Sequence, residues 1–466
     1  MSFGGWDFVG SRQDGAPRFR VTSAQFFVGS FVFLVVLGAL GLLVLPGLYT
    51  GERLGVVDSL FTAASAVCVT GLTVVDTATY FTPLGQAWIA VLIQLGGIGI
   101  LTLTTLVILG LGRRMSLDLE RAGGGHTTVL SHLSQRSLLG AVVRFTFAIE
   151  LGGAIVLWVL WRGRLGSSAA LWPAVFHSIS AFCNAGFSIF SHSLMDFRAS
   201  PLTLVTVSGL IILGGLGFLV LVDLWARARG TGRGRLSLHT KIVLWSSAIL
   251  LVGGTFGFLV FESPFDLRLL GMPDQVVNAW FMSATARTAG FHTVDYSTAS
   301  NGSILLTLAL MVIGGSPGST AGGLKTTSVV LLVLMLWSRL RGRSHTSAFG
   351  RTIPRDTLER AAGVVIAGFL VLALFVFLLL ILELPEHGEL DRVHLLEMVF
   401  EAHSAFGTVG LSMGATPKLT DGGRLLITLL MFLGRVGPLA FAVSLVNRRN
   451  RAREDYRFAQ EDVVVG

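Results

Sequence analysis

The chain has 466 residues, of which 52% are hydrophobic and only 13% are charged. Ordinary soluble domains carry about 25% charged residues. This composition therefore excludes an ordinary soluble domain and indicates an all-α integral membrane protein. The net charge of +8 does not indicate a nucleic-acid-binding protein, because the basic residues fall in alternate loops and form no single patch.

Two apolar stretches illustrate the predicted membrane spans. Residues 26–49 and 364–384 are each long enough to cross a bilayer, which takes about 20 such residues. The first is longer than the apolar core of a secretory signal, about 7–15 residues, so we expect it to remain in the mature chain. Membrane lipids are therefore expected around the protein.

Predicted loops that are rich in lysine and arginine alternate with loops that are poor in both. The basic residues gather before the first span and after the second, fourth, sixth and last, at Arg12, Arg18, Arg20, Arg113, Arg114, 227–241, 339–360 and 448–453. Loops rich in Lys and Arg stay in the cytoplasm. The pattern predicts an even number of spans with both termini in the cytoplasm.

A short pattern occurs four times: Ser-Ala, then four or five residues, then Gly followed by Leu or Phe. The copies are SAVCVTGL (65–72), SAFCNAGF (180–187), SATARTAGF (283–291) and SAFGTVGL (404–411). A long apolar span and an amphipathic stretch of roughly 10–14 residues precede each copy, and that stretch is too short to cross a bilayer. A second, Gly-rich span follows each copy.

This order predicts eight transmembrane helices, arranged as four membrane-pore-membrane repeats around a central pseudo-fourfold pore. The predicted parts are a cytoplasmic N-terminus (1–23), four repeats (24–115, 137–229, 238–340 and 357–448) and a cytoplasmic tail (449–466). Small residues also let membrane helices pack closely. Four copies at equivalent places favour pore loops over that alternative.

Irregular backbone at membrane depth is tolerated where it lines a water-filled cavity, and rings of carbonyl oxygens can replace the hydration shell of a cation. Glycine permits the left-handed backbone that such a carbonyl row needs. The negative C-terminal ends of the preceding short helices also favour cations. The predicted ion-selectivity filter comprises Val69, Thr70, Gly71, Asn184, Ala185, Gly186, Thr288, Ala289, Gly290, Thr408, Val409 and Gly410.

Two carboxylates follow the filter segments at equal spacing. Asp76 and Asp295 each lie five residues after a filter glycine, and at the outer mouth they would concentrate cations. A solvated loop, or an N-cap for the next span, is an equally good reading of both.

The sixth span is predicted to break, because glycine and proline cost about 1 and 3 kcal/mol in a helix. Together with Arg435 in the last span, the break forms a predicted gate: Gly314, Gly315, Ser316, Pro317, Gly318, Ser319, Thr320, Ala321, Gly322, Gly323, Lys325 and Arg435. Intramembrane cations are costly and mark functional sites. The alternatives are a passive kink, and a Lys325 that reaches the cytoplasmic interface.

Two further charges lie near the filter. We expect Arg287 to brace the third filter segment from behind the pore, and Glu401 to be its counter-ion.

Other classes fit less well. No HExxH motif is present, and the two GxSxG matches, at 314–318 and 410–414, do not lie on a turn between a strand and a helix, so an enzyme is not expected. Cys68 and Cys183 are far apart and give no metal-site spacing, and without a P-loop or GxGxxG motif we expect no cofactor on this chain. A secondary transporter is the main rival; it would show discontinuous helices in corresponding positions of two halves, whereas only the sixth span looks strongly broken.

The segments VTGLTVVDT (69–77), NAGFS (184–188), RTAGFHT (287–293) and GTVGLS (407–412) resemble the four filter segments of the Trk, Ktr and HKT superfamily of K⁺ transporters. The resemblance covers nearly the whole chain. It implies K⁺ bound at Gly71, Gly186, Gly290 and Gly410, with K⁺, or Na⁺ as well, as the transported or activating ion. It also implies a gate loop that blocks the pore and is anchored by Arg435.

The short segment before the first span and the tail QEDVVVG are similar to those of KtrB-type subunits. This resemblance implies a homodimer in the bacterial inner (plasma) membrane. It also implies a cytosolic KtrA-type ring of nucleotide-binding domains, docked on the basic connectors.

Overall fold

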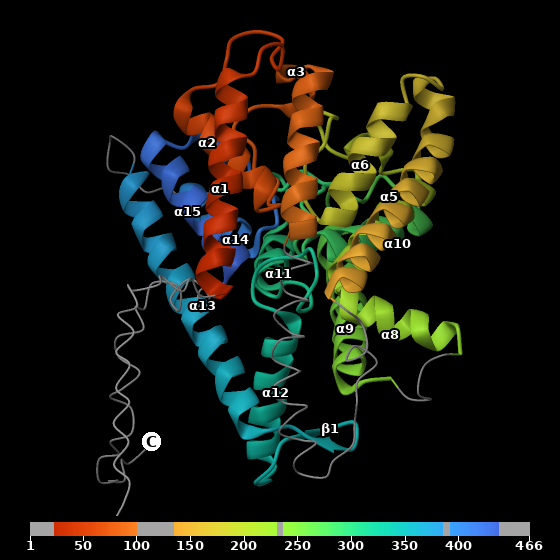
Figure 1. The fold of residues 1–466 in the computed structure, drawn as a ribbon, viewed down its shortest axis with the longest axis vertical. Helices are drawn as coiled ribbons and strands as arrows, with labels where there is room; N and C mark the ends of the chain where they lie inside the picture. Colours follow the sequence, from red (N-terminus) through yellow and green to blue (C-terminus); the bar gives the residue numbers. More distant parts are fainter. Residues whose placement is uncertain (1–22, 100–134, 231–235, 385–391, 438–466) are drawn as a thin grey trace, which may run out of the picture.

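The computed structural model describes residues 23–99, 135–230, 236–384 and 392–437 (Figure 1). The predicted cytoplasmic tail (449–466), nearly all of the predicted N-terminus (1–23) and the ends of the first and fourth repeats lie outside the described residues. The basic residues Arg12, Arg18, Arg20, Arg113 and Arg114 and the basic run at 448–453 lie outside them as well.

The described residues in the first half of the chain form longer and shorter helices and a bent pair, α7 with α8. The elements of this half are α1 (Ser23–Val44), α2 (Val56–Val67), α3 (Thr77–Tyr80), a helix at Pro83–Gly99, α5 (Gln135–Leu165), α6 (Leu171–Cys183), η2 (Met195–Phe197), α7 (Pro201–Leu216) and α8 (Phe218–Ala228).

The second half follows a similar order, with a two-stranded antiparallel hairpin between its two units. Its elements are α9 (Leu238–Glu262), α10 (Met272–Thr285), α11 (Asn301–Val312), α12 (Thr326–Leu340), β1 (Ser347–Ala348), β2 (Arg351–Thr352), α13 (Arg355–Leu382), α14 (Arg392–Gly407), η3 (Thr416–Lys418) and α15 (Asp421–Val436). The hairpin lies at one end of the molecule, and α2 and α3 lie at the other (Figure 1).

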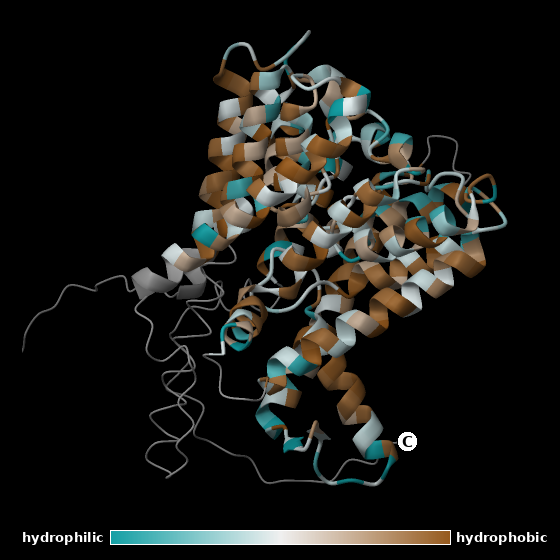
Figure 2. Cartoon of the chain, turned by 90° about the vertical axis from the view of Figure 1, so that its right-hand side faces the viewer, coloured by the Kyte–Doolittle hydropathy of each residue, from teal (hydrophilic) through white to brown (hydrophobic). Residues whose placement is uncertain are grey.

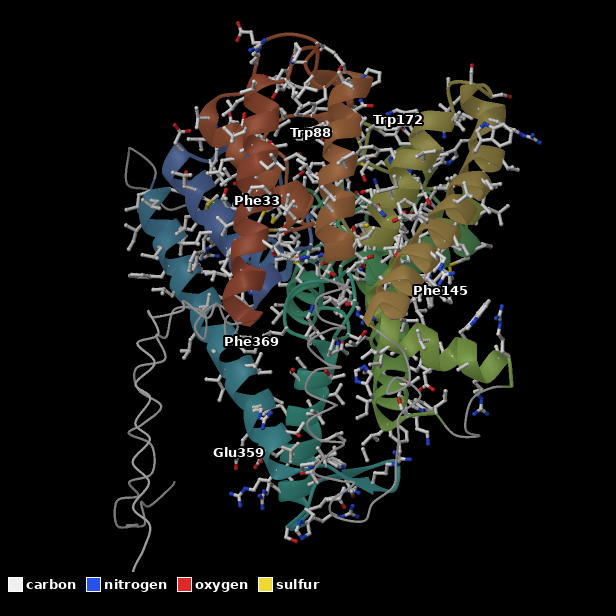
Figure 3. All side chains as sticks on the ribbon, viewed as in Figure 1. Phe33, Trp88, Phe145, Trp172, Glu359 and Phe369 are labelled. Atoms are coloured by element: carbon white, nitrogen blue, oxygen red, sulfur yellow. The ribbon has the colours of Figure 1, made fainter. Side chains whose placement is uncertain are left out.

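Several helices have the length and apolar composition of membrane-spanning helices. Within the described residues, Gly140–Leu165, α9 and α13 are long and apolar enough to cross a membrane, and α7 with α8 makes a fourth if the bent pair counts as one span. Apolar residues dominate these helices, and hydrophilic ones gather in the end loops (Figure 2). Phe33 on α1 and Phe369 on α13 are more than half exposed (Figure 3), as expected of lipid-facing side chains.

Local sequence signals fix several helix starts. Ser237, Ser300 and Thr420 cap α9, α11 and α15, because each side chain accepts a hydrogen bond from the backbone N–H three residues later. Such a cap stabilises a helix end by about 1 kcal/mol. Pro201 begins α7, where its missing N–H costs nothing.

The four short helices α2, α6, α10 and α14 form the centre. They have 12, 13, 14 and 16 residues, so α14 is longer than the sequence suggested. Each of α2, α6 and α10 packs on the long helix before it, and α14 packs on α13. Each also meets the second long helix of a neighbouring unit: α2 meets α15, α10 meets α7 and α14 meets α11. Cys183 at the end of α6 meets Gly97 in the helix at Pro83–Gly99, which closes the ring.

A second helix is broken as well as the predicted one. α11 ends at Val312 and α12 begins at Thr326, which leaves the predicted break between them. In addition, α8 leaves α7 at 101° across Gly217, whose φ is +86°. The expectation of a single broken span was therefore wrong. The sequence did not reveal this break, because glycines in an apolar helix are as typical of close helix packing as of a bend.

Candidate ion pathway

The four repeated segments share an unusual backbone. In each, a residue with positive φ is followed two positions later by a glycine with positive φ: Val69 and Gly71, Asn184 and Gly186, Thr288 and Gly290, Thr408 and Gly410. Left-handed backbone costs a non-glycine residue about 1–3 kcal/mol, and persists where the surrounding structure enforces it. Three of these non-glycine residues are β-branched, which makes the strain greater.

The segments meet in a closed ring of glycines and carbonyls. A Cβ on Gly71 would lie 2.3 Å from the carbonyl oxygen of Ala185, in the next segment along the chain. The same relation joins the other segments in order: Gly186 to the Ala289 carbonyl at 2.9 Å, Gly290 to the Val409 carbonyl at 2.2 Å, and Gly410 to the Thr70 carbonyl at 2.2 Å. All twelve predicted filter residues therefore lie in four segments that come together, and no side chain fits at the four glycines.

A hydroxyl group from each short helix holds the segment that follows it. Ser65 donates to the Leu72 carbonyl at 2.7 Å, and Ser180 donates to the Phe187 carbonyl at 2.7 Å. Ser404 accepts from the Gly410 N–H at 3.0 Å.

In the third unit this hydroxyl comes from Thr285, which donates to the Phe291 carbonyl at 2.7 Å. Ser283, the serine of the repeated Ser-Ala pair in this unit, donates instead to the Leu251 carbonyl of α9. The third copy has one additional residue between Ser-Ala and glycine. As a result Ser283 faces α9, and Thr285 makes the bond to the third segment.

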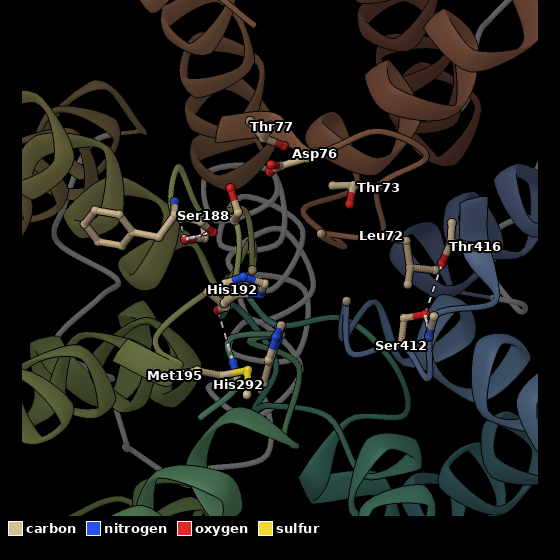
Figure 4. A pocket seen from close by; sticks show the side chains of 18 of the residues that line it. Leu72, Thr73, Asp76, Thr77, Ser188, His192, Met195, His292, Ser412 and Thr416 are labelled. Atoms are coloured by element: carbon tan, nitrogen blue, oxygen red, sulfur yellow. Dashed lines mark hydrogen bonds between the residues drawn. The ribbon is translucent and has the colours of Figure 1, made fainter. Parts of the chain in front are cut away.

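A cavity of about 300 Å³ opens on one side of the glycine ring (Figure 4). All four glycines line it, together with Asp76, Asp295, Ser188, His192, His292, Ser412 and Thr416. Asp76 also caps α3, with its Oδ1 3.0 Å from the Ala78 nitrogen, and Asp295 accepts from the Ser297 N–H at 2.9 Å. The two carboxylates therefore line the cavity and also satisfy their own loops. His192 was missed because no spacing rule marks it.

Glu401 lies behind the wall of this cavity and bonds two residues that line it, Ser412 and Thr416. Its carboxylate is fully buried and accepts hydrogen bonds from the hydroxyls of Ser412 and of Thr416, the latter at 2.9 Å. In the described part of the chain no ion pair joins it to Arg287, so the predicted pairing was wrong. Two nearby hydroxyls satisfy the carboxylate locally.

Arg287 contacts α9 and lies near Gly315 of the predicted gate. Its guanidinium lies 3.5 Å from the Ser247 hydroxyl, and its side chain lines a cavity of about 20 Å³ with Gly215, Leu216 and Gly315. It therefore borders α9 and the end of α7. The expectation that Arg287 braces the third filter segment from behind the pore stays a prediction.

Residues 314–325, called the gate segment below, lie under the glycine ring. The Thr320 hydroxyl donates to the Phe182 carbonyl at 3.1 Å, in the last turn of α6. A Cβ on Gly322 would meet the Thr408 hydroxyl oxygen at 2.1 Å, so the segment touches the base of the fourth filter segment. The other predicted gate residues, Gly314 to Gly323, lie in the same buried stretch between α11 and α12.

Both predicted basic residues contact the gate segment. Arg435 is 2% exposed and donates to the Thr320 carbonyl, and its second nitrogen lies 3.5 Å from the Gly96 carbonyl oxygen. Lys325 donates to the Ala321 carbonyl at 2.7 Å. Lys325 therefore bonds within the segment, and the reading in which it reaches the interface does not hold.

Three hydroxyls of the filter segments have no hydrogen-bond partner in the described part of the chain: Thr70, Thr288 and Thr408. Buried hydroxyls are normally paired with protein, water or a ligand. Those of Thr70, Thr288 and Thr408 are therefore available to water or a cation. Among the same described residues, no group of three His, Cys, Asp or Glu side chains forms a metal site, and Cys68 and Cys183 are buried free thiols.

Replacing Glu401 with glutamine should weaken ion discrimination while the protein still folds. The new amide nitrogen cannot accept a hydrogen bond, so either Ser412 or Thr416 loses its partner. An unpaired buried hydroxyl costs about 1–3 kcal/mol. The ratio of Rb⁺ to Na⁺ uptake into liposomes measures the effect. An unchanged ratio, with size-exclusion profiles like those of wild type, would show that the carboxylate does not position the cavity wall.

The apolar helices and the closed ring of backbone carbonyls define a multi-pass integral membrane protein of the transport class. The model of the TrkH family, described as "Cation transport protein", matches residues 20–451. The chain therefore belongs to this family, whose members are cation transporters and not enzymes.

Named relatives and a solved structure agree with the family. "Potassium/sodium uptake protein NtpJ" of Enterococcus hirae is 36% identical over 96% of this chain and 98% of its own length. "Ktr system potassium uptake protein B" of Bacillus subtilis is 36% identical over 96% of this chain and 97% of its own. The crystal structure of the potassium transporter TrkH from Vibrio parahaemolyticus has a TM-score of 0.72 at 18% identity, covering 93% of this chain and 87% of that one, and shows a similar fold.

Proposed function

We propose that this chain is the K⁺-selective translocating subunit of a bacterial K⁺ uptake system, with channel-like conduction through a filter of four segments. The observation that carries the proposal is the closed ring in which each glycine abuts the carbonyl of the next segment. Carbonyl oxygens replace water around a dehydrated cation. The names of the two relatives, potassium or potassium/sodium uptake proteins, support K⁺ as the ion, with Na⁺ as a second or activating ion.

The proposed path crosses the membrane through eight helices in four pseudo-fourfold repeats. The cavity with Asp76 and Asp295 would face outward and attract cations. The exposed Arg339, Arg341 and Arg351 lie at the α12 and hairpin end, opposite α2 and α3 (Figure 1), which favours that end as cytoplasmic. The protein would then sit in the bacterial plasma membrane with both termini inside.

The gate segment is proposed to close this path. It lies beneath the filter segments, contacts Thr408 through Gly322, and brings the Arg435 guanidinium beside the Thr320 carbonyl. A buried cation below the filter raises the barrier for K⁺ by repulsion, and more strongly than it would in water. Opening would require the segment to leave.

Partners are proposed from the relatives. The name of the Bacillus protein places it in a Ktr system as component B. We extend this to a homodimer of the present chain that carries a cytosolic, KtrA-type ring of nucleotide-binding domains on its basic connectors, with lipid around the apolar faces. The chain itself would need no cofactor.

A secondary cation transporter with alternating access is the second candidate. It is favoured by one observation: α7 with α8 and α11 with α12 are broken helices at corresponding positions of successive units. Discontinuous helices in corresponding positions are typical of secondary transporters. Channel-like conduction would give unitary currents in planar bilayers, whereas a transporter would give only saturable flux.

Purified protein in liposomes should take up ⁸⁶Rb⁺ in preference to ²²Na⁺. The carbonyl ring provides a site for a large, easily dehydrated cation, so we expect Rb⁺ uptake to exceed Na⁺ uptake by about tenfold, which corresponds to about 1.4 kcal/mol. Empty liposomes provide the background. Equal uptake of both ions, or no uptake by folded protein even when the gate segment is removed, would contradict the proposed filter.

A further inference from the structure

The bend between α7 and α8 lies directly against the gate segment. α7 ends at Leu216, and Gly217 at the bend has a φ of +86°. A Cβ on Gly217 would lie 2.9 Å from both the Pro317 carbonyl oxygen and the Ser316 hydroxyl oxygen. The two broken helices therefore meet at their breaks.

The carbonyls that end α7 find their partners in the gate segment. The last four carbonyls of a helix have no partner within it. The Gly214 carbonyl accepts from the Thr320 N–H at 3.2 Å, and the Gly215 carbonyl accepts from the Ser316 N–H at 3.1 Å. The Ser316 hydroxyl approaches the Gly215 carbonyl at 3.1 Å and also contacts that of Leu216. Ser316 thus makes most of these bonds.

The same groups would pair differently in a straight helix. The carbonyls of residues 214, 215 and 216 would then accept from the N–H groups of residues 218, 219 and 220. In the present structure the Phe218 N–H donates instead to the Gly318 carbonyl of the gate segment, at 2.9 Å. A buried carbonyl or N–H left without a partner costs about 1–3 kcal/mol. The bent helix and the docked gate segment therefore stabilise each other.

We propose that the α7–α8 bend and the gate segment form one two-state switch, with Ser316 as the positioning residue that couples them. In the closed state the helix is bent and its carbonyls hold the gate segment under the filter. In the open state α7 and α8 are continuous, their carbonyls are satisfied within the helix, and the segment is released. The inference rests on the proposed function, because it takes residues 314–325 as the gate.

A further contact holds the bend without touching the gate segment. Asp223 on α8 accepts from the Thr240 hydroxyl at 2.6 Å and from the Ser237 N–H at 3.1 Å, at the start of α9. Coupling between two parts of a switch is reciprocal. Weakening the bend at Asp223 should therefore open the gate, although the hydrogen bonds of Asp223 go to the start of α9 and not to the gate segment.

The first test is Rb⁺ uptake into liposomes by Ser316→Ala, Gly217→Ala and Asp223→Ala. Ser316→Ala removes the hydroxyl contacts, and Gly217→Ala disfavours the left-handed bend by about 1–2 kcal/mol, so each should raise uptake by about tenfold. Gly209→Ala in α7 is the matched control, since no atom lies within 4 Å of its added Cβ. We expect it to leave uptake unchanged.

The second test measures the bend itself. Val205 on α7 and Arg229 at the end of α8 are exposed, so cysteines introduced at these two positions can carry spin labels. Protein without the introduced cysteines, treated in the same way, measures background labelling of the two buried native thiols. At a bend of 101° the labelled backbone sites lie about 23 Å apart, and in a straight helix about 36 Å apart. Ser316→Ala should shift the distance distribution toward the longer value.

The outcomes separate the switch from the proposed function. Longer distances together with higher uptake in all three variants support the switch. Distances that stay near the shorter value in the variants overturn the switch. Wild-type uptake in all three variants also overturns it, if removal of 314–323 raises uptake. If no version conducts Rb⁺, the proposed function fails, and the distance measurement alone decides whether Ser316 couples the segment to the bend.

Discussion

Replacing Gly71 with serine is expected to reduce the preference for Rb⁺ over Na⁺ by about tenfold. Gly71 has a φ of +92°, and its Cβ would lie 2.3 Å from the Ala185 carbonyl oxygen. A left-handed non-glycine residue costs about 1–2 kcal/mol, and the Ala185 carbonyl must also move. Because that carbonyl belongs to the ring, the distortion reaches the proposed ion site directly.

Liposome uptake of ⁸⁶Rb⁺ and ²²Na⁺ in parallel measures this preference. Gly166→Ser is the matched control: Gly166 also has a positive φ, +88°, but nothing lies within 4 Å of its Cβ. It should keep the wild-type ratio, which separates general backbone strain from damage to the ring. A Gly71→Ser protein that folds and still discriminates like wild type would remove the first segment from the filter.

Deleting residues 314–323 is expected to raise Rb⁺ uptake by about tenfold or more. The deletion removes the Thr320 carbonyl that Arg435 contacts and the hydroxyl bonded to the Phe182 carbonyl. Each hydrogen bond that holds the closed segment contributes about 1 kcal/mol, so losing several shifts the balance strongly toward an open path. Ile313 and Leu324 already form a backbone bridge, so the deletion joins residues that are neighbours.

Uptake by the deletion variant is compared with that of Arg435→Met, which keeps the segment but removes the buried positive charge. Size-exclusion profiles and thermal unfolding establish that both proteins are folded. Raised uptake in both variants would support a gate made by the segment and its arginine together. Uptake at the wild-type level in a folded deletion variant would mean that residues 314–323 are a passive kink.

Particular residues show what sequence reasoning reached. The four glycines of the ring were found because a repeated position that tolerates no Cβ leaves a repeated signature, and the break after Val312 was found because several glycines and a proline cannot hold a helix. The bend at Gly217 was missed, since one short glycine cluster in an apolar run is also typical of close helix packing.

Polar partners were harder to predict. Arg287 and Glu401 have opposite charges and precede the third and the fourth repeated segment, but the carboxylate bonds Ser412 and Thr416 of its own repeat. Thr285 replaced Ser283 because one extra residue turned the serine toward α9. A hydrogen bond depends on the direction of a side chain, which spacing does not give.

The sequence by itself determined that this is a membrane protein with four repeated segments and a broken helix after Val312, because hydropathy, glycine content and internal repetition are local properties of the chain. Only the tertiary structure decided that each glycine faces the carbonyl of the next segment, that α7 bends, and that Ser316 binds the carbonyls at that bend. These features arise from contacts between segments far apart in the chain. They depend on which surfaces meet once the four units close into a ring.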